Sequence, residues 1–427
     1  SFEKAKEALR AAWLNQGPQN PHNSAHYGHF AFQPVSAMQF LDNGIRPFTG
    51  SLLRLEAHAQ NEAAFSPVEG RSELSRFGEL SFAWILQALL PLFIIVLCFN
   101  TITGDRENQN LKLIAVQSVK IQSYIWGKIL SNYSLIMILA FVGLLIQLIA
   151  YKIETSGIAH IPFNTISVWF LLYAIYLLII TGFRVLASAW ARQGKTALVV
   201  QISVWVLLMV VMPKMTANAG SRIYPMEHKF DFKKASGEDR KKGINGHDPS
   251  DERSRVFEGS LLKHYGVKSL ADLPINADGL LMQADEDYAN LVYDKHFNRV
   301  RNNISRQNSI SRWVSFVNPY LSLRNISMSV CESDFNSYLN FLVDAEKYRR
   351  YLIKKLNFSL AYDGSKTNDW NWKVTPDYWA TVKDISYSQI SIKEKLENAV
   401  VEISALITLL LLMVTAVIIT SKKITVL

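Results

Sequence analysis

The sequence predicts a mainly α membrane protein, in which a polytopic helix bundle carries an α-rich domain outside the membrane. Hydrophobic residues make up 49% of the 427 residues and gather in long uninterrupted runs. About 20 apolar residues in a helix are enough to cross a bilayer. A long polar stretch separates the last two of these runs. The runs therefore indicate membrane spans, and the polar stretch indicates a domain that folds in water.

Five apolar runs are long enough to be spans. We predict them at residues 81–99, 129–151, 166–186, 197–213 and 400–420. The fourth run is short and ends at Pro213, whose ring and missing N–H disfavour a continuing helix. We therefore expect the fourth span to end there, and either to be tilted little or to thin the bilayer locally.

Basic residues in the short loops predict the orientation of the bundle. They gather in three segments, 100–128, 187–196 and 421–427. The positive-inside rule places such segments in the cytoplasm, whereas long stretches cross the membrane regardless of their charge. Three segments then lie outside, namely 1–80, 152–165 and 214–399. The N-terminal segment shows no signal-peptide pattern, so we expect a sixth span upstream of Ser1 to start its export.

Several polar side chains fall inside or at the ends of the predicted spans: Gln87, Gln147, Arg184, Gln201 and Glu402. Lone glutamines more often hydrogen-bond neighbouring helices than conduct protons. We expect the charged ends of Arg184 and Glu402 to reach the membrane interface. No chain of ionisable groups crosses the spans, which argues against a proton-coupled transporter.

Helical periodicity is clearest in the second half of the polar stretch. Apolar residues recur every three or four positions from Phe335 to Leu356, and Ser333 or Asp334 can cap the start of that helix. We predict a second helix over residues 285–303. The polar stretch is long enough to bury a core of its own.

For three other segments the sequence predicts three different structures: a helix, an exposed loop and short strands. Residues 1–15 have a helical period and would continue the upstream span beyond the membrane. Residues 231–255 are charged and contain glycine, so we expect an exposed loop there. Residues 362–387 are less regular and are expected to hold a short strand or two.

Composition and motifs argue against several function classes. Cys98 and Cys331 fall in segments of different character, so we expect neither a disulfide nor a cysteine-type zinc site. The net charge of +9 comes from bases scattered among nearly as many acids, which argues against nucleic acid as a partner. The segments 194–196 and 364–367 imitate the end of a phosphate-binding loop but lack its leading glycine. Because the sequence contains no hydrolase or redox motif, we predict that the chain is not an enzyme. A membrane-anchored enzyme, with site residues dispersed along the sequence, is kept as an alternative hypothesis.

Three histidines stand close together near the start of the chain. His22, His26 and His29 are spaced by four and three residues, which on a helix would place them on one face as a divalent-metal site. Pro21 and Gly28 favour a turn-rich segment instead, and no cysteine or acid stands close. A metal site and a purely structural, hydrogen-bonding role both stay open.

The segment between the first two spans has the composition of a docking element. It opens with polar and charged residues, continues with a compact apolar patch over residues 111–116, and closes with Gly127 and Lys128. Such an amphipathic element can lie in the membrane interface or in the groove of a partner.

This segment resembles the cytoplasmic segment of ABC-2-type transporter permeases. Asp105-Arg106-Glu107 corresponds to the family's acidic-basic-acidic triplet, residues 111–114 to its leucine run, Ser118-Val119 to its turn, and Gly127-Lys128 to its close. Gln109-Asn110 departs from the usual Gly-Thr. Further segments resemble a permease subfamily that has a large uncharacterised extracytoplasmic domain before the last span: 20–28, 42–50, 55–61, 318–329 and 345–349.

The resemblance implies a function and a set of partners. The chain would be the permease subunit of an exporter in the bacterial inner membrane, with six spans, a periplasmic domain and an unidentified substrate. ATP and Mg would be bound by a separate ATPase subunit, and this chain would bind no cofactor directly. The chain would form a dimer with a second permease, either another copy of itself or a related chain, and membrane lipids would surround the dimer. The residues expected to couple to the ATPase are Asp105, Arg106, Glu107, Leu111, Leu113, Ile114, Gly127 and Lys128. The alternative is an accessory membrane protein whose outer domain binds or hands over a ligand or metal without transport.

Overall fold

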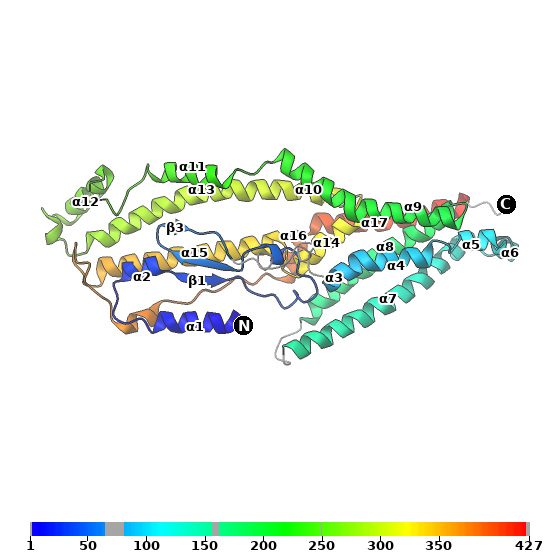
Figure 1. Ribbon diagram of the computed structural model, residues 1–427, viewed down its shortest axis with the longest axis horizontal. Coiled ribbons are helices and arrows are strands. Elements are labelled where there is room, and N and C mark those ends of the chain that lie inside the picture. Colours follow the sequence, from blue (N-terminus) through cyan, green and yellow to red (C-terminus); the bar gives the residue numbers. More distant parts are fainter. Residues whose placement is uncertain (1, 65–80, 156–161, 249, 424–427) are drawn as a thin grey trace.

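The computed structural model describes residues 2–64, 81–155, 162–248 and 250–423 of the chain. The molecule is elongated, with the apolar helices gathered at one end and a polar domain at the other (Figure 1). Parts of four predicted segments lie outside the described residues: residues 1 and 65–80 of the N-terminal segment, residues 156–161 of the loop at 152–165, residue 249 of the segment 214–399, and residues 424–427 of the tail.

Five helices in the described residues are long and apolar enough to cross a membrane, which confirms the prediction of a mainly α polytopic protein. The first, Phe82–Glu107, begins with α3 (Phe82–Trp84), the π-helical η3 (Ile85–Leu89) and α4 (Leu90–Cys98). The second and third are α7 (Ile121–Glu154) and α8 (Phe163–Trp190). The fourth consists of α9 (Gly194–Val206), η4 (Leu207–Val211) and α10 (Met212–Ile223), and the fifth is α17 (Val400–Lys423).

The helix that contains the predicted fourth span does not end at Pro213. The helix widens into the π-helical turn η4 just before the proline and then continues as α10 to Ile223. A proline clashes with the carbonyl four residues before it, and a π-turn is a common way to relieve such strain. The side-chain amide of Asn318 donates to the Leu208 carbonyl at 2.8 Å, which satisfies a carbonyl inside this turn. The helix can therefore leave the bundle without a break.

Helix α8 lies at the centre of the bundle, where it packs against α4, α7 and α17. The prediction that Arg184 and Glu402 reach the interface is wrong, because both are buried. Arg184 donates to the Gln201 carbonyl at 2.9 Å, and Glu402 accepts from Arg312 at 3.0 Å. Each charge has a partner inside the protein, which removes the need to reach water.

The polar domain is built on two long helices that lie side by side, α13 (Ala277–Val314) and α15 (Phe335–Tyr362) (Figure 1). Near them lie α1 (Phe2–Leu14), α2 (Pro21–Tyr27) and a small antiparallel sheet in the order β1 (His29–Phe32), β2 (Leu52–Glu56), β3 (Ala59–Gln60). In the sheet, His29 pairs with Leu55 and Phe32 pairs with Leu52. Trp13, Leu55, Leu352 and Trp379 are among the residues that form the core of this domain.

Shorter elements complete the polar domain and its junction with the bundle. They are η1 (Arg46–Phe48), α11 (Lys229–Arg240), α12 (Glu252–Tyr265), η5 (Leu270–Asp272), α14 (Pro319–Val330), η6 (Pro376–Thr381) and α16 (Ile392–Asn398). The fourth span enters this domain directly, because α10 packs along α13.

The two strongest helix predictions in the polar regions are confirmed. Helix α15 covers the predicted period and is capped by Asp334, which accepts from the Ser337 amide at 3.0 Å. Helix α1 occupies nearly all of the segment 1–15. The predicted helix at 285–303 is also present, but as the middle of the much longer α13.

The exposed loop predicted at residues 231–255 is wrong for most of that range, because α11 and the start of α12 are helical. Lys, Glu and Arg are good helix formers, so their charge alone does not indicate a loop. Phe232 anchors α11 by packing edge-on against Phe297 of α13, with ring centroids 5.1 Å apart. In the segment 362–387 the described residues form η6 and a single bridge between Gln19 and Val374 rather than a strand.

Candidate metal centre and candidate docking segment

Two of the three predicted histidines come together on α2. Asn20 caps this helix by accepting from the His22 amide at 2.8 Å, Pro21 is in its first turn, and Gly28 follows its last residue with a positive φ of 76°. Proline at the start and glycine just past the end are typical helix boundaries, so the turn-rich interpretation is wrong. His22 and His26 lie one turn apart, and their Nε2 atoms are 3.0 Å apart.

His29 does not join them. It opens strand β1, and its ring packs against Trp13 and Tyr348 with ring centroids 5.3 Å and 5.8 Å apart. Because Gly28 ends the helix, the spacing of three residues from His26 no longer follows a helical face. The expectation that His29 shares a face with the other two is therefore wrong.

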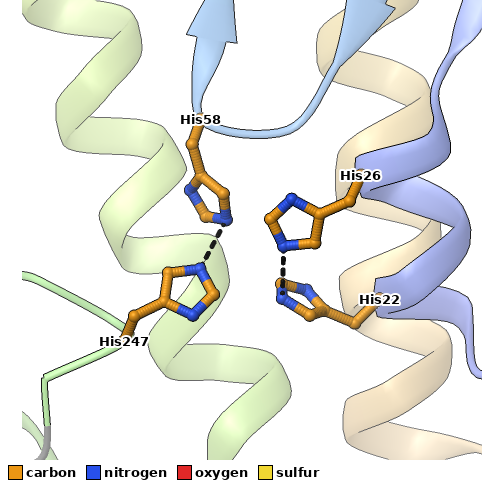
Figure 2. Close-up of side chains that lie close together, drawn as sticks. All are labelled: His22, His26, His58 and His247. Atoms are coloured by element: carbon orange, nitrogen blue, oxygen red, sulfur yellow. Dashed lines mark hydrogen bonds between the residues drawn. The ribbon is translucent and has the colours of Figure 1, made fainter.

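Two histidines from distant parts of the chain take its place. His58 lies in the turn between β2 and β3 with a φ of 59°, and His247 lies between α11 and α12. Their Nε2 atoms are 2.9 Å apart. One nitrogen from each of His22, His26, His58 and His247 lies within 4.8 Å of the others, and Figure 2 shows the four rings facing a common centre. We call these four residues the histidine cluster.

Two acidic residues of α13, Asp285 and Glu286, contact the histidine cluster and the loop that carries His247. The Nδ1 atom of His58 lies 3.2 Å from Glu286 Oε1 and 3.5 Å from Asp285 Oδ2. Glu286 also accepts from the His58 backbone amide and from the buried Arg349 guanidinium. Asp285 pairs with Arg240 at 2.8 Å and accepts from the Gly246 amide at 3.4 Å, next to His247. The two carboxylates therefore position both histidines that come from loops.

The surroundings favour uncharged imidazoles. Burial, with a further effect from the neighbouring histidines, lowers the pKa of His22 to about 3. Burial is also the main reason that the pKa values of His26 and His247 are lowered, and the neighbouring His58 adds to the lowering. The neutral imidazole is the form of histidine that binds metal ions. The arrangement can therefore offer several nitrogen ligands to one ion.

Six of the eight predicted coupling residues lie at the other end of the molecule, in α5 (Thr103–Glu107) and α6 (Asn110–Val116), and Gly127 and Lys128 lie in α7 (Figure 1). Asp105 accepts from the Tyr124 hydroxyl at 2.6 Å and pairs with Lys128 at 2.8 Å, both in α7. Arg106 donates to the Ala191 and Ala189 carbonyls at 2.6 Å and 2.8 Å. Glu107 accepts from the Gly194 amide at 2.9 Å. The three charged side chains thus fasten α5 to α7, to the end of α8 and to the start of α9.

The apolar residues of this segment divide into buried and exposed ones. Leu111 is only 2% exposed, and Ile114 is partly buried. Leu113 and Val116 are 64% and 83% exposed. Gly127 lies inside α7, where its Cβ position is open. Leu113 and Val116 therefore offer apolar surface that the described residues leave uncovered, and we call this pair the α6 patch.

Comparison with known proteins identifies one region. Residues 231–381 match a family described as "Domain of unknown function (DUF3526)". This region begins in α11, ends in η6 and includes His247, Asp285 and Glu286. No curated protein and no solved structure matches the chain.

Proposed function

We propose that this chain is the membrane-spanning permease subunit of an exporter that is driven by a separate ATP-binding subunit. The observation that carries the proposal is the construction of the α5–α6 segment. It presents the exposed α6 patch, while Asp105, Arg106 and Glu107 fasten its base to three spans. A segment that is both exposed and rigidly attached can pass the movement of a docked partner into the bundle.

The placement of the basic segments supports an orientation with α5 and α6 in the cytoplasm. The turn between α8 and α9 contacts Arg106 and Glu107, and Trp190 donates to Thr420 near the end of α17 at 2.9 Å. Three segments rich in Lys and Arg thus meet at one end of the bundle. The polar domain would then lie outside the cytoplasmic membrane of a bacterium.

The proposal assigns ATP hydrolysis to the partner. Two ATPase subunits would dock on two permeases, either two copies of this chain or this chain with a related one. ATP binding would close the ATPase pair, and the α5–α6 segments would bias the spans between inward-open and outward-open arrangements.

The α6 patch gives the test. We expect that Leu113→Asp combined with Val116→Asp reduces co-purification of a co-expressed partner ATPase by about tenfold or more, because burying each apolar side chain contributes about 1.5–3 kcal/mol. The measurement is the ATPase-to-permease ratio after affinity purification from detergent.

Val256 provides a matched control. It is 68% exposed but lies on α12 in the polar domain, so Val256→Asp should leave the ratio unchanged. If the double variant still binds as much ATPase as the unaltered chain, the assignment of the docking surface is wrong.

A further inference from the structure

We propose that the histidine cluster binds one divalent transition-metal ion of borderline softness, for which Zn²⁺ is the reference, and that the ion joins three separate segments of the polar domain. The ligands are the Nε2 atoms of His22 and His26 on α2, of His58 in the β2–β3 turn and of His247 after α11. This site is independent of whether the chain transports anything.

The spacing of the nitrogens fits one ion. Zn–N bonds of about 2.0–2.1 Å in a tetrahedron place neighbouring nitrogens about 3.3–3.4 Å apart. The two Nε2 pairs stand 3.0 Å and 2.9 Å apart, and all four ligand atoms lie within 4.8 Å of one another. Small rotations of the imidazole rings are enough to reach the coordinated geometry.

One histidine of the cluster, His58, also has a carboxylate beside its other ring nitrogen. A ligating histidine usually donates its other ring nitrogen to a carboxylate, which fixes the tautomer and the orientation of the ring. The Nδ1 atom of His58 lies 3.2 Å from Glu286 Oε1, an ion-pair distance without hydrogen-bond geometry, and its Nε2 faces the Nε2 of His247 at 2.9 Å. Glu286 is fixed in turn by Arg349 at 3.0 Å, in a pair that is buried. The carboxylate is therefore positioned before any ion binds.

The ligand chemistry selects the class of ion. Four imidazole nitrogens suit Zn²⁺, Cu²⁺, Ni²⁺ and Co²⁺, whereas Mg²⁺ and Ca²⁺ require oxygen ligands. His22 is buried while His26 and His247 are exposed, so an ion can reach the cluster from one side. Four protein ligands fill a tetrahedral sphere, as in structural rather than catalytic zinc sites.

The ion would act as a cross-link within the fold. His22, His26 and His58 belong to the N-terminal part of the chain, and His247 belongs to the region 231–381 that matches the family of unknown function. A bound ion would hold the segment that joins α11 to α12 against α2. Lys241 and Lys242, both exposed, open that segment and are cleavage points for trypsin.

The experiment uses the full chain, purified in detergent with a tag other than polyhistidine. After stripping with a chelator, the protein is titrated with Zn²⁺ against a fluorescent zinc indicator, and then loaded with Co²⁺ for visible absorption. We expect one Zn²⁺ per chain, Co²⁺ bands of the intensity typical of tetrahedral nitrogen coordination, and slower tryptic cleavage at Lys241 and Lys242 when metal is present.

Matched variants assign the ligands. His26→Ala and His247→Ala remove exposed ligands and should abolish stoichiometric binding, while His264→Ala on the exposed face of α12 should not change it. Asp285→Asn should weaken binding by about 10–100-fold, as expected for a second-sphere group. Its control is Asp287→Asn, an exposed carboxylate two residues further along α13.

Three results would overturn the proposal. They are Zn²⁺ binding that is weak and non-stoichiometric, equal loss of binding in His264→Ala and His247→Ala, and octahedral Co²⁺ bands. Circular dichroism and gel-filtration profiles of each variant separate loss of a ligand from loss of the fold, because His26 and His247 contribute little to the core.

Discussion

Gly279 shows how one missing side chain sets the distance between the two long helices of the polar domain. A Cβ atom at this position of α13 would lie 2.6 Å from the Ala361 amide nitrogen and 2.6 Å from the Asn357 carbonyl oxygen, both on α15. Backbone atoms cannot move aside as a flexible side chain can. The close approach of α13 and α15, on which Glu286 and Arg349 meet, therefore requires glycine here.

We predict that Gly279→Ala destabilises the protein by about 1–3 kcal/mol, the usual cost of overpacking. Gly259 is the control, because it lies within α12 with nothing within 4 Å of its Cβ position. Gly259→Ala should instead stabilise by up to about 1 kcal/mol through helix propensity. Thermal unfolding in detergent, followed by tryptophan fluorescence, should shift in opposite directions for the two variants; equal shifts would contradict the argument.

The three charged residues of α5 have partners within the chain that their sequence does not indicate. From the sequence we expect Asp105, Arg106 and Glu107 to contact the ATPase, whereas in the structure all three bind groups of the chain itself. A charged triplet has the same composition whether it faces a partner or caps the ends of neighbouring helices. Only the positions of α8 and α9 distinguish these uses.

Among the elements, the fourth span depends most on a single side chain. Asn318 donates to the Leu208 carbonyl in η4, and its side-chain oxygen accepts from the Tyr320 and Leu321 amides at the start of α14. One buried amide thus satisfies a widened helical turn and caps another helix. This is why the chain can pass Pro213 without losing the helix.

Two substitutions separate the roles of Asn318. Asn318→Ala should lower thermal stability by about 2–4 kcal/mol, since it leaves a buried carbonyl unpaired and removes a helix cap. Asn318→Ser keeps a capping oxygen but is too short to reach Leu208, so about half of that loss is expected. Equal losses in the two variants, measured by thermal unfolding in detergent, would show that capping contributes nothing.

Over the whole molecule, the bundle and the polar domain are joined by an ion pair as well as by continuous helices. Arg312 near the end of α13 pairs with Glu402 in the first turn of α17, and the carboxylate is buried. Arg312 also donates to the Asn398 carbonyl at 2.8 Å. Movement of α17 relative to the polar domain would have to break these bonds.

We predict that Arg312→Ala loosens this junction at a cost of up to about 3 kcal/mol, less than for a fully buried pair because Arg312 is partly exposed to solvent. The measurement is hydrogen–deuterium exchange, which should rise in the first turn of α17 and the last turns of α13. The double variant Arg312→Met with Glu402→Met removes both charges and should recover much of the protection. Exchange as fast in the double variant as in Arg312→Ala would mean that packing, not the unpaired charge, is at fault.

The parts of this protein that depend on local pattern could be predicted from the sequence. Apolar runs indicated the five spans, the period of three and four indicated α15, and Asp334 was identified as a possible cap, because run length, periodicity and capping are all encoded by neighbouring residues. The sequence also indicated His22 and His26, since they share one turn of helix.

The histidine cluster could not be predicted as a whole, because His58 and His247 are 189 residues apart and neither stands in a recognisable motif. They meet only because Asp285 and Glu286 on α13 hold the β2–β3 turn and the segment after α11 beside α2. Contacts between distant segments form when the apolar core brings helices together. The sequence pattern around each residue does not indicate these contacts. The membrane spans are therefore a property of the local sequence, whereas the cluster is a property of the packed fold.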